Sequence, residues 1–255
     1  MNEKPASIIL TIKDSDGNHI RNVKKNASDG SGRIAWNLRH TSYYPVRAGS
    51  VQANSWFNPS GPYVTPGEYV ADLYLENNGS IEKLDGPINF NVKPLRKSTL
   101  KGASYDDYNS FRKRVSSLYV EMSKYQDEFN MMDNKIQLLE KATMQLSEFS
   151  PELMSKISKF KAKYNAFDSE IGGNPARAEI GEWDKPTISN RVQIAMQGLS
   201  TSYGPTDLNK SNLGIAERLF KDLVNDVKAF KSELESLEKE IMDLNPPHLS
   251  GTGIN

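Results

Sequence analysis

The feature that most constrains the fold of this chain is a long stretch, residues 103–150, that contains neither glycine nor proline. These two residues interrupt helices more than any others, so the stretch can form one continuous helix. Positions at alternating spacings of three and four form a seam that is apolar except at one threonine, which is the heptad pattern. The seam consists of Tyr108, Phe111, Val115, Leu118, Met122, Tyr125, Phe129, Met132, Ile136, Leu139, Thr143 and Leu146. A helix of about 44 residues would be ~65 Å long, and other segments must cover its seam because a single helix of that kind is not stable alone.

The rest of the C-terminal half supplies such segments. Ser150 followed by Pro151 is typical of a helix start, because serine caps helix N-termini and proline suits the first helical position. A short helix is expected after Pro186, and a second long helix is expected between Pro205 and Pro246. The apolar positions of these segments are Leu153, Ile157, Phe160, Tyr164 and Phe167; Ile188, Val192, Ala195 and Leu199; and Leu219, Leu223, Val227, Phe230, Leu234, Leu237, Ile241 and Leu244. We expect the seams to form a core within the chain, and an intermolecular coiled coil is the alternative.

Residues 6–93 have a different period. Apolar and polar side chains alternate in four runs, as expected for strands with one buried face. The apolar members are Ile8, Leu10 and Ile12; Ile34, Trp36 and Leu38; Tyr69, Ala71, Leu73 and Leu75; and Ile88, Phe90 and Val92. Turn-forming clusters separate the runs, at residues 14–18, 28–32, 65–67 and 77–79. Short strands with frequent turns indicate a β-sandwich of the immunoglobulin type.

The two periods together predict a segregated α+β fold. An immunoglobulin-like β-sandwich is expected over residues 1–97, and an antiparallel helical bundle with two long and two short helices over residues 103–245. Residues 246–255 are expected to form a flexible tail.

Composition narrows the possible partners and compartments. The 255 residues carry 32 basic and 32 acidic side chains, and this balance argues against nucleic acid as a partner because phosphate binding needs a basic surplus. The absence of cysteine excludes a disulfide scaffold, a thiol nucleophile and thiolate zinc sites. The sequence has no run near the ~20 apolar residues of a membrane span, and its start lacks the features of a secretory signal. We expect a periplasmic or extracellular location if the chain is part of a longer secreted protein, and an unknown one otherwise.

The usual signatures of catalysis and cofactor binding do not occur in the sequence. His19, His40 and His248 are far apart and have no metal-ligand spacing, and there is no nucleophile elbow, phosphate loop or dinucleotide motif. Residues 14–18 resemble the start of a calcium loop, but His19 stands at its sixth position and Lys25 at its twelfth, where glycine and glutamate are required. A hairpin turn is expected there instead, and we expect no catalytic residue, metal or cofactor.

An acidic loop offers a hydrolase hypothesis. Glu182 and Asp184 flank Trp183, and two carboxylates beside an aromatic ring are found at sugar-cleaving sites. The alternative is a linker in which Trp183 covers the end of the helical bundle, and we favour this alternative.

A second unusual segment, residues 41–64, is rich in aromatic residues, proline and glycine. A long irregular connection in a compact domain is often functional. Its aromatic side chains are Tyr43, Tyr44, Trp56, Phe57 and Tyr63. They could dock on another domain, cover the open edge of the sandwich, or stack on a glycan, which would make the module carbohydrate-binding.

A set of short motifs resembles a known family. The motifs are Trp36-Asn37-Leu38-Arg39, then Gly61-Pro62, then Pro66-Gly67-Glu68-Tyr69. They are similar to the C-terminal region of bacterial sortilin-like BNR/Asp-box β-propeller proteins, often labelled glycosyl hydrolases, in which an immunoglobulin-like module precedes a helical region. Residues 16–21 also resemble the related module of flagellar hook-capping proteins. The chain departs from the family at Asn37, where an acid is usual, and at residues 93–96, and it has no Asp-box of the propeller.

This resemblance implies a non-catalytic accessory region whose sandwich docks on an adjacent β-propeller domain or another protein. The helical bundle would then serve as a stalk or a partner surface. Trp36 is expected to anchor the core between sheets, and Gly67 to permit the turn before the next strand. The family's chemistry belongs to the propeller, so the resemblance carries over no catalytic residue.

Overall fold

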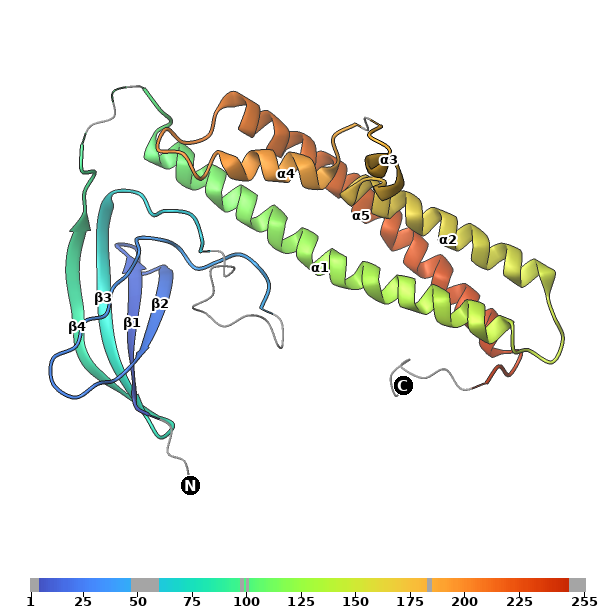
Figure 1. Ribbon diagram of the computed structural model, residues 1–255, viewed down its shortest axis with the longest axis horizontal. Coiled ribbons are helices and arrows are strands. Elements are labelled where there is room, and N and C mark those ends of the chain that lie inside the picture. Colours follow the sequence, from blue (N-terminus) through green and yellow to red (C-terminus); the bar gives the residue numbers. More distant parts are fainter. Residues whose placement is uncertain (1–4, 47–59, 97–98, 100, 183–184, 248–255) are drawn as a thin grey trace. The chain divides into compact units, whose positions relative to one another are not determined.

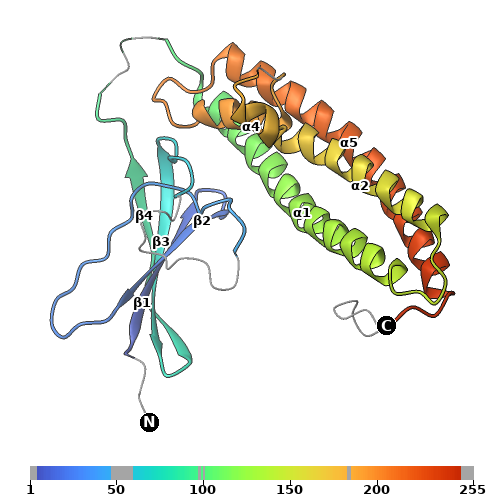
Figure 2. The ribbon, with the colours of Figure 1, turned by 45° about the vertical axis from the view of Figure 1, so that its right-hand side comes forward.

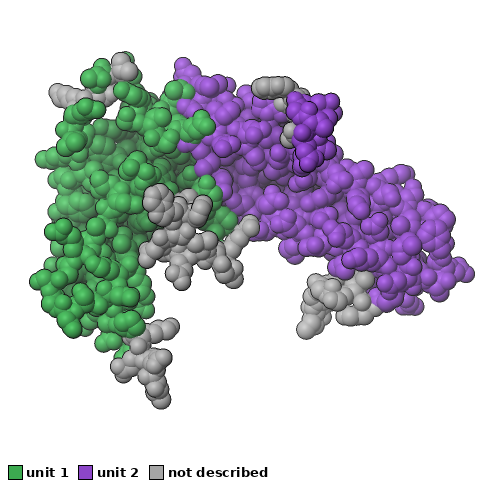
Figure 3. Space-filling model, viewed as in Figure 1, with its two compact units in different colours: residues 1–116, 197–206 green, residues 117–196, 207–255 purple. Residues whose placement is uncertain are grey.

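A computed structural model describes residues 5–46, 60–96, 99, 101–182 and 185–247. The described residues form an N-terminal four-stranded antiparallel sheet followed by five helices, two of them long (Figure 1). This confirms the predicted segregated α+β class. The chain divides into two compact units (Figure 3), residues 1–116 with 197–206, and residues 117–196 with 207–255.

The sheet of the first unit contains β1 (Ser7–Asp14), β2 (His19–Asn26), β3 (Gly67–Asn77) and β4 (Ser80–Val92). Its strand order is β2-β1-β3-β4, and every neighbouring pair is antiparallel. Paired residues in an antiparallel sheet point to the same side, and every second residue of a strand lies on the same face. The alternating apolar residues of β1 and β3 therefore lie on one face of the sheet. Leu10, for example, pairs with both Val23 and Leu73.

Two predicted turns are confirmed by their backbone geometry. Between β1 and β2 the Asp14 carboxylate accepts hydrogen bonds from the backbone amides of Asp16 and Asn18, at 3.1 and 2.8 Å. Between β3 and β4, Asn78 and Gly79 have φ values of 49° and 83°. Two successive residues in the left-handed region fit the two-residue hairpin that asparagine–glycine favours.

The predicted strand at residues 34–38 is wrong. The segment has no strand conformation, and only Arg39 beyond it makes an isolated bridge, to Tyr63. Leu38 has a φ of 57°, which a strand cannot contain. The alternation remains meaningful because Trp36 packs against the apolar face of the sheet. The described residues therefore form one sheet, and irregular chain that includes Trp36 packs on its apolar face. The sequence predicted two sheets.

The helices are α1 (Tyr105–Thr143), α2 (Pro151–Gly172), α3 (Pro175–Glu179), α4 (Ile188–Gln197) and α5 (Asp207–Met242). The predicted cap of α2 is confirmed, since Ser150 accepts a hydrogen bond from the Leu153 amide. The described residues contain five helices where four were expected. The additional one, α3, has five residues, too few for an apolar period to reveal it.

Helices α2, α5 and the part of α1 from residue 117 lie side by side (Figure 2), and their buried side chains, with those of α4, form the core of the second unit. Their contacts include several ring pairs, measured between centroids: Phe129 with Phe167 at 6.4 Å, Phe167 with Phe230 at 5.5 Å, and Tyr125 with Phe220 at 5.3 Å. Ion pairs between the helices show the directions in which they run. Lys156 pairs with Glu240 and Lys163 with Glu233, so α2 runs antiparallel to α5. Along α1, Tyr125 contacts Phe220 and the later Lys135 pairs with Glu238, so residue numbers rise in the same direction in both helices and α1 runs parallel to α5.

Candidate functional site

The motif residues singled out in the sequence meet in the first unit, at one end of the sheet. Trp36 lies with its ring centroid 5.6 Å from that of Tyr69 and 6.1 Å from that of Phe90. Its indole Nε1 donates a hydrogen bond of 2.9 Å to the carbonyl oxygen of Arg39. The tryptophan is therefore fixed both by packing and by its polar atom, as a half-buried indole requires.

Arg39, Gly61 and Pro62 join two segments that are distant in sequence. The His40 amide donates to the Pro62 carbonyl at 3.0 Å, and an Arg39 guanidinium nitrogen donates to the Gly61 carbonyl at 3.1 Å. A Cβ atom at position 61 would lie 2.5 Å from the His40 carbonyl oxygen, so only glycine fits there. Arg39 Cζ also lies 3.7 Å from the ring centroid of Tyr63, a cation–π contact that holds this ring in place.

Tyr69 ties the start of β3 to the preceding turn. Its hydroxyl donates a 2.6 Å hydrogen bond to the carbonyl oxygen of Thr65. Burial raises the pKa of Tyr69, so its hydroxyl keeps the proton that this bond needs. Gly67 opens β3 and does not have a positive φ, so the left-handed conformation that only glycine adopts freely is not used at this position.

A pocket of about 360 Å³ lies next to this cluster, within the first unit. Three segments line it: the chain before β3, the start of α1 with the residues before it, and the loop after α4. We call it the tyrosine pocket, and its lining residues are Tyr63, Val64, Thr65, Pro66, Ala103, Tyr105, Tyr108, Leu199, Ser200, Thr201, Ser202, Tyr203 and Gly204. Of these described residues, four are tyrosines, four carry aliphatic hydroxyls, and none has a charged side chain.

Close backbone contacts fix the walls of the tyrosine pocket. The Ala103 amide donates a 2.8 Å hydrogen bond to the Tyr203 carbonyl, and a Cβ at Gly102 would lie 2.6 Å from the same oxygen. The Tyr108 hydroxyl lies 3.1 Å from the carbonyl oxygen of Leu199, to which it donates. Burial raises the pKa of Tyr108, so this donor stays protonated at neutral pH.

His40 lies in the same unit and has an unusual protonation equilibrium. Burial, assisted by the positive charge of Arg112 and opposed by Asp14, lowers the pKa of His40 to about 4. Burial also lowers the pKa of Arg112. His40 is therefore neutral at pH 7, and its ring can join hydrogen bonds without adding charge beside the guanidinium.

The remaining predicted residues are placed separately. Tyr43 and Tyr44 stack with ring centroids 5.4 Å apart, and neither lines the tyrosine pocket, whereas Tyr63 does. Trp56 and Phe57 lie outside the described residues. Glu182 is exposed, and its Oε2 lies 3.8 Å from Arg177 Nε. Trp183 and Asp184, the other two residues of the acidic loop, are also outside the described residues.

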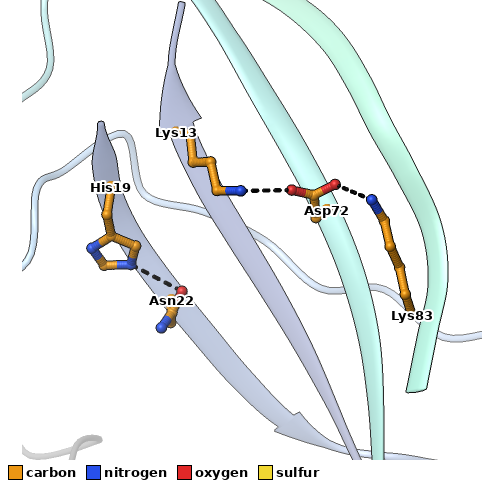
Figure 4. Close-up of polar contacts among 5 residues, drawn as sticks. All are labelled: Lys13, His19, Asn22, Asp72 and Lys83. Atoms are coloured by element: carbon orange, nitrogen blue, oxygen red, sulfur yellow. Dashed lines mark hydrogen bonds and ion pairs between the residues drawn. The ribbon is translucent and has the colours of Figure 1, made fainter. Parts of the chain in front are cut away.

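The polar groups on the other face of the sheet form a structural cluster. The buried Asp72 carboxylate lies between two lysines, 3.2 Å from Lys13 Nζ and 2.7 Å from Lys83 Nζ (Figure 4). His19 lies with Nε2 3.0 Å from the amide oxygen of Asn22. His248 is outside the described part of the chain.

Within the described ranges, no three histidine or acidic side chains are grouped so that they could hold a metal ion. No described helix is long and apolar enough to cross a membrane. Searches with this chain found no matching family model, no matching curated protein and no matching solved structure.

Sequence reasoning missed most of the tyrosine pocket. The sequence places Tyr108 in the helical seam, and Tyr105 and Tyr203 belong to no motif. Tyr105 and Tyr203 are about a hundred residues apart, and contacts between distant segments, such as the Ala103–Tyr203 and Tyr108–Leu199 hydrogen bonds, bring them together. The single local signal is the Tyr203-Gly204-Pro205 sequence, which marks a tight turn before a helix.

Proposed function

We propose that this chain is a non-catalytic interaction region of a sortilin-like β-propeller protein. Its sheet would dock on the propeller, and its helices would form a stalk or a surface for another partner. Such a protein would be bacterial and secreted, and periplasmic or extracellular. The proposal includes an immunoglobulin-like origin of the sheet region. The Tyr69–Thr65 bond supports this, because a tyrosine that bonds to the backbone a few residues upstream is a hallmark of such domains.

The observation that carries the proposal is a half-exposed apolar face on the sheet. Ile12 and Tyr69 are buried under Trp36 and its neighbours at one end of this face. Towards the other end, between the paired charged residues Lys25, Glu82 and Asp85 of the outer strands, the same face continues through apolar side chains that remain partly exposed. These are Ile8 and Leu10 on β1, Val23 on β2, and Leu73 and Leu75 on β3.

An apolar surface of this kind is a docking surface, because burying it against a partner removes it from water. β4, at the edge of the sheet, extends it with Ile88, which is 50% exposed and pairs with Ala71 on the same face. An additional protein layer over this face would complete the two-layer arrangement that a one-sided apolar sheet needs. A propeller domain is large and rigid enough to provide that layer.

The test is complex formation between the full chain and a β-propeller domain encoded with it, in the same reading frame or an adjacent one. Co-elution in size-exclusion chromatography is expected for the unaltered chain. Leu75→Lys should abolish it, because the lysine charge would be buried in the interface. Tyr74→Lys is the matched control, since Tyr74 is the half-buried neighbour on the opposite face of the same strand.

Failure of the unaltered chain to co-elute at any salt concentration would contradict the proposal. Equal loss of binding in both variants would also contradict it, because the apolar face would then have no special part. Circular dichroism of both variants separates loss of binding from loss of folding.

A further inference from the structure

The tyrosine pocket has the chemistry of a binding site for a particular kind of small molecule. Among the described residues that line it, none has an acidic or basic side chain. A charged ligand entering it would lose hydration without gaining a counter-charge, which is costly. The pocket therefore selects an uncharged ligand.

The rings in the lining are accessible to such a ligand. Tyr63, Tyr105 and Tyr203 are 48%, 52% and 42% exposed, so part of each ring is open to solvent, while the Arg39 guanidinium covers one face of the Tyr63 ring. Aromatic rings offer flat apolar surface with a polar tip, which suits a ligand that has both an apolar face and polar groups. Apolar walls with a few well-placed polar groups are usual in small-molecule sites.

Hydroxyl groups supply the polar side of the pocket. Ser200, Thr201 and Ser202 follow one another along one wall. The Thr201 hydroxyl already donates to the Gly204 carbonyl at 3.1 Å, but its oxygen can still accept a hydrogen bond. Consecutive hydroxyls of this kind can exchange hydrogen bonds with a ligand that has several hydroxyls of its own.

The pocket is also held open by its own backbone. Gly204 has a φ of 76°, and a Cβ there would lie 2.9 Å from Ala103 Cβ, so only glycine fits at this position of the wall. Asn109 Nδ2 donates to Thr65 Oγ1 at 3.2 Å and joins two of the three walls. A preformed site avoids much of the ordering cost of binding.

We propose that the tyrosine pocket binds an uncharged sugar, with one ring of the sugar against the tyrosines and its hydroxyls bonded to the serine and threonine wall. The volume is at the lower end of the ~300–1,000 Å³ of small-molecule sites, which suits a mono- or disaccharide unit. This site is distinct from the apolar face of the sheet and does not depend on the docking function proposed above.

The test begins with the full chain on a glycan array that carries neutral and sialylated glycans. The bound neutral glycan is then titrated calorimetrically as a free oligosaccharide. Tyr105→Ala and Tyr203→Ala should each weaken binding by about tenfold or more, as expected for the loss of one stacking ring. Tyr44→Ala is the matched control, because Tyr44 is a partly exposed tyrosine in the aromatic segment but outside the pocket.

Three results would overturn the proposal. They are the absence of any neutral glycan signal, a preference for sialylated glycans, and loss of binding in Tyr44→Ala with Tyr105→Ala unaffected. The last would move sugar binding to residues 41–64. None of these experiments uses a propeller domain, so their failure is distinguishable from a failure of docking.

Discussion

The helical core of the second unit and the sheet of the first unit differ in how completely they cover their own apolar residues. In the helices, side chains such as Phe129, Ile136 and Phe230 are at most 1% exposed, and the seams of α1, α2 and α5 cover one another. In the sheet, the buried apolar cluster consists of Ile12, Ile20, Val64 and Tyr69. The helical core is thus self-sufficient, whereas the sheet has apolar surface left for contacts outside itself.

The difference follows from the geometry of the two elements. A helix with a heptad seam needs only other helices of similar length, and this chain contains them. A sheet with one apolar face needs a whole covering layer. The described residues provide that layer mainly through Trp36 and Val64, at one end.

The largest effect is expected in the helical core. Phe230 is 0% exposed and its ring centroid lies 5.3 Å from that of Phe160. Phe230→Ala should lower the free energy of unfolding by about 3–5 kcal/mol, because it leaves a cavity among rings. Urea unfolding followed by circular dichroism at 222 nm measures this. The exposed Phe149→Ala is the control, and a loss under about 1 kcal/mol for Phe230→Ala would remove the contrast between the two cores.

A somewhat smaller effect is expected at Trp36. Because Trp36 is half-buried and covers Tyr69 and Phe90, Trp36→Ala should cost the sheet about 3 kcal/mol. Hydrogen exchange of the β1 and β3 amides should show the loss directly. Trp36→Phe should restore part of the protection. Unchanged exchange in Trp36→Ala would mean that the sheet does not depend on this covering residue.

The pH dependence of the first unit should reflect His40. The pKa of His40 in the folded chain, about 4, lies below its unfolded value of about 6.5. Between these two pH values His40 is protonated in the unfolded chain and neutral in the folded chain. The free energy of unfolding should therefore fall as the pH decreases through this range, by about 2 kcal/mol after allowance for partial exposure. Below pH 4 the contribution levels off.

His40→Gln should flatten that part of the pH profile. Denaturant unfolding of both proteins between pH 4 and 7 provides the comparison, and His19→Gln controls for the loss of a histidine on an exposed strand position. Parallel profiles for the unaltered chain and His40→Gln would contradict the assignment.

The smallest effect is expected at Asp72. Hydrogen bonding from Lys83, and then from Lys13, lowers its pKa, so the ionised carboxylate stabilises the folded sheet above its unfolded pKa of about 3.9. Asp72→Asn should cost about 1 kcal/mol at pH 7, and the difference should vanish as the pH falls through the lower folded pKa. Glu76→Gln, which removes a more exposed pair with Lys24, should cost less. An equal cost for both variants at pH 7 would show that burial of Asp72 adds nothing.

The same contrast explains what the sequence could reveal. Helix α1 was predictable because its seam is a local repeat, and the Asn78-Gly79 turn because its geometry depends on two adjacent residues. The prediction of a strand at residues 34–38 was wrong because the alternation of apolar and polar residues cannot reveal the positive φ of Leu38. Trp36, Arg39, Gly61 and Tyr69 were identified as a motif, yet their contacts with one another depend on pairings across the chain.

The tyrosine pocket was beyond sequence reasoning for a related reason. Its walls come from three segments that no shared period connects. Only the folded backbone places Tyr105, Tyr203 and Tyr63 around one opening. Local patterns therefore predicted the elements, while the candidate site depends on long-range contacts.

The central claim is that the half-exposed apolar face of the sheet is an interface, and calorimetry tests it most directly. The proposed partner, a β-propeller domain encoded with this chain, would be titrated into the full chain at several temperatures. Burial of the face around Leu10 and Leu75 predicts a clearly negative heat-capacity change of binding, lost in Leu75→Lys and kept in Tyr74→Lys. Binding with a heat-capacity change near zero, or no binding at all, would contradict the claim.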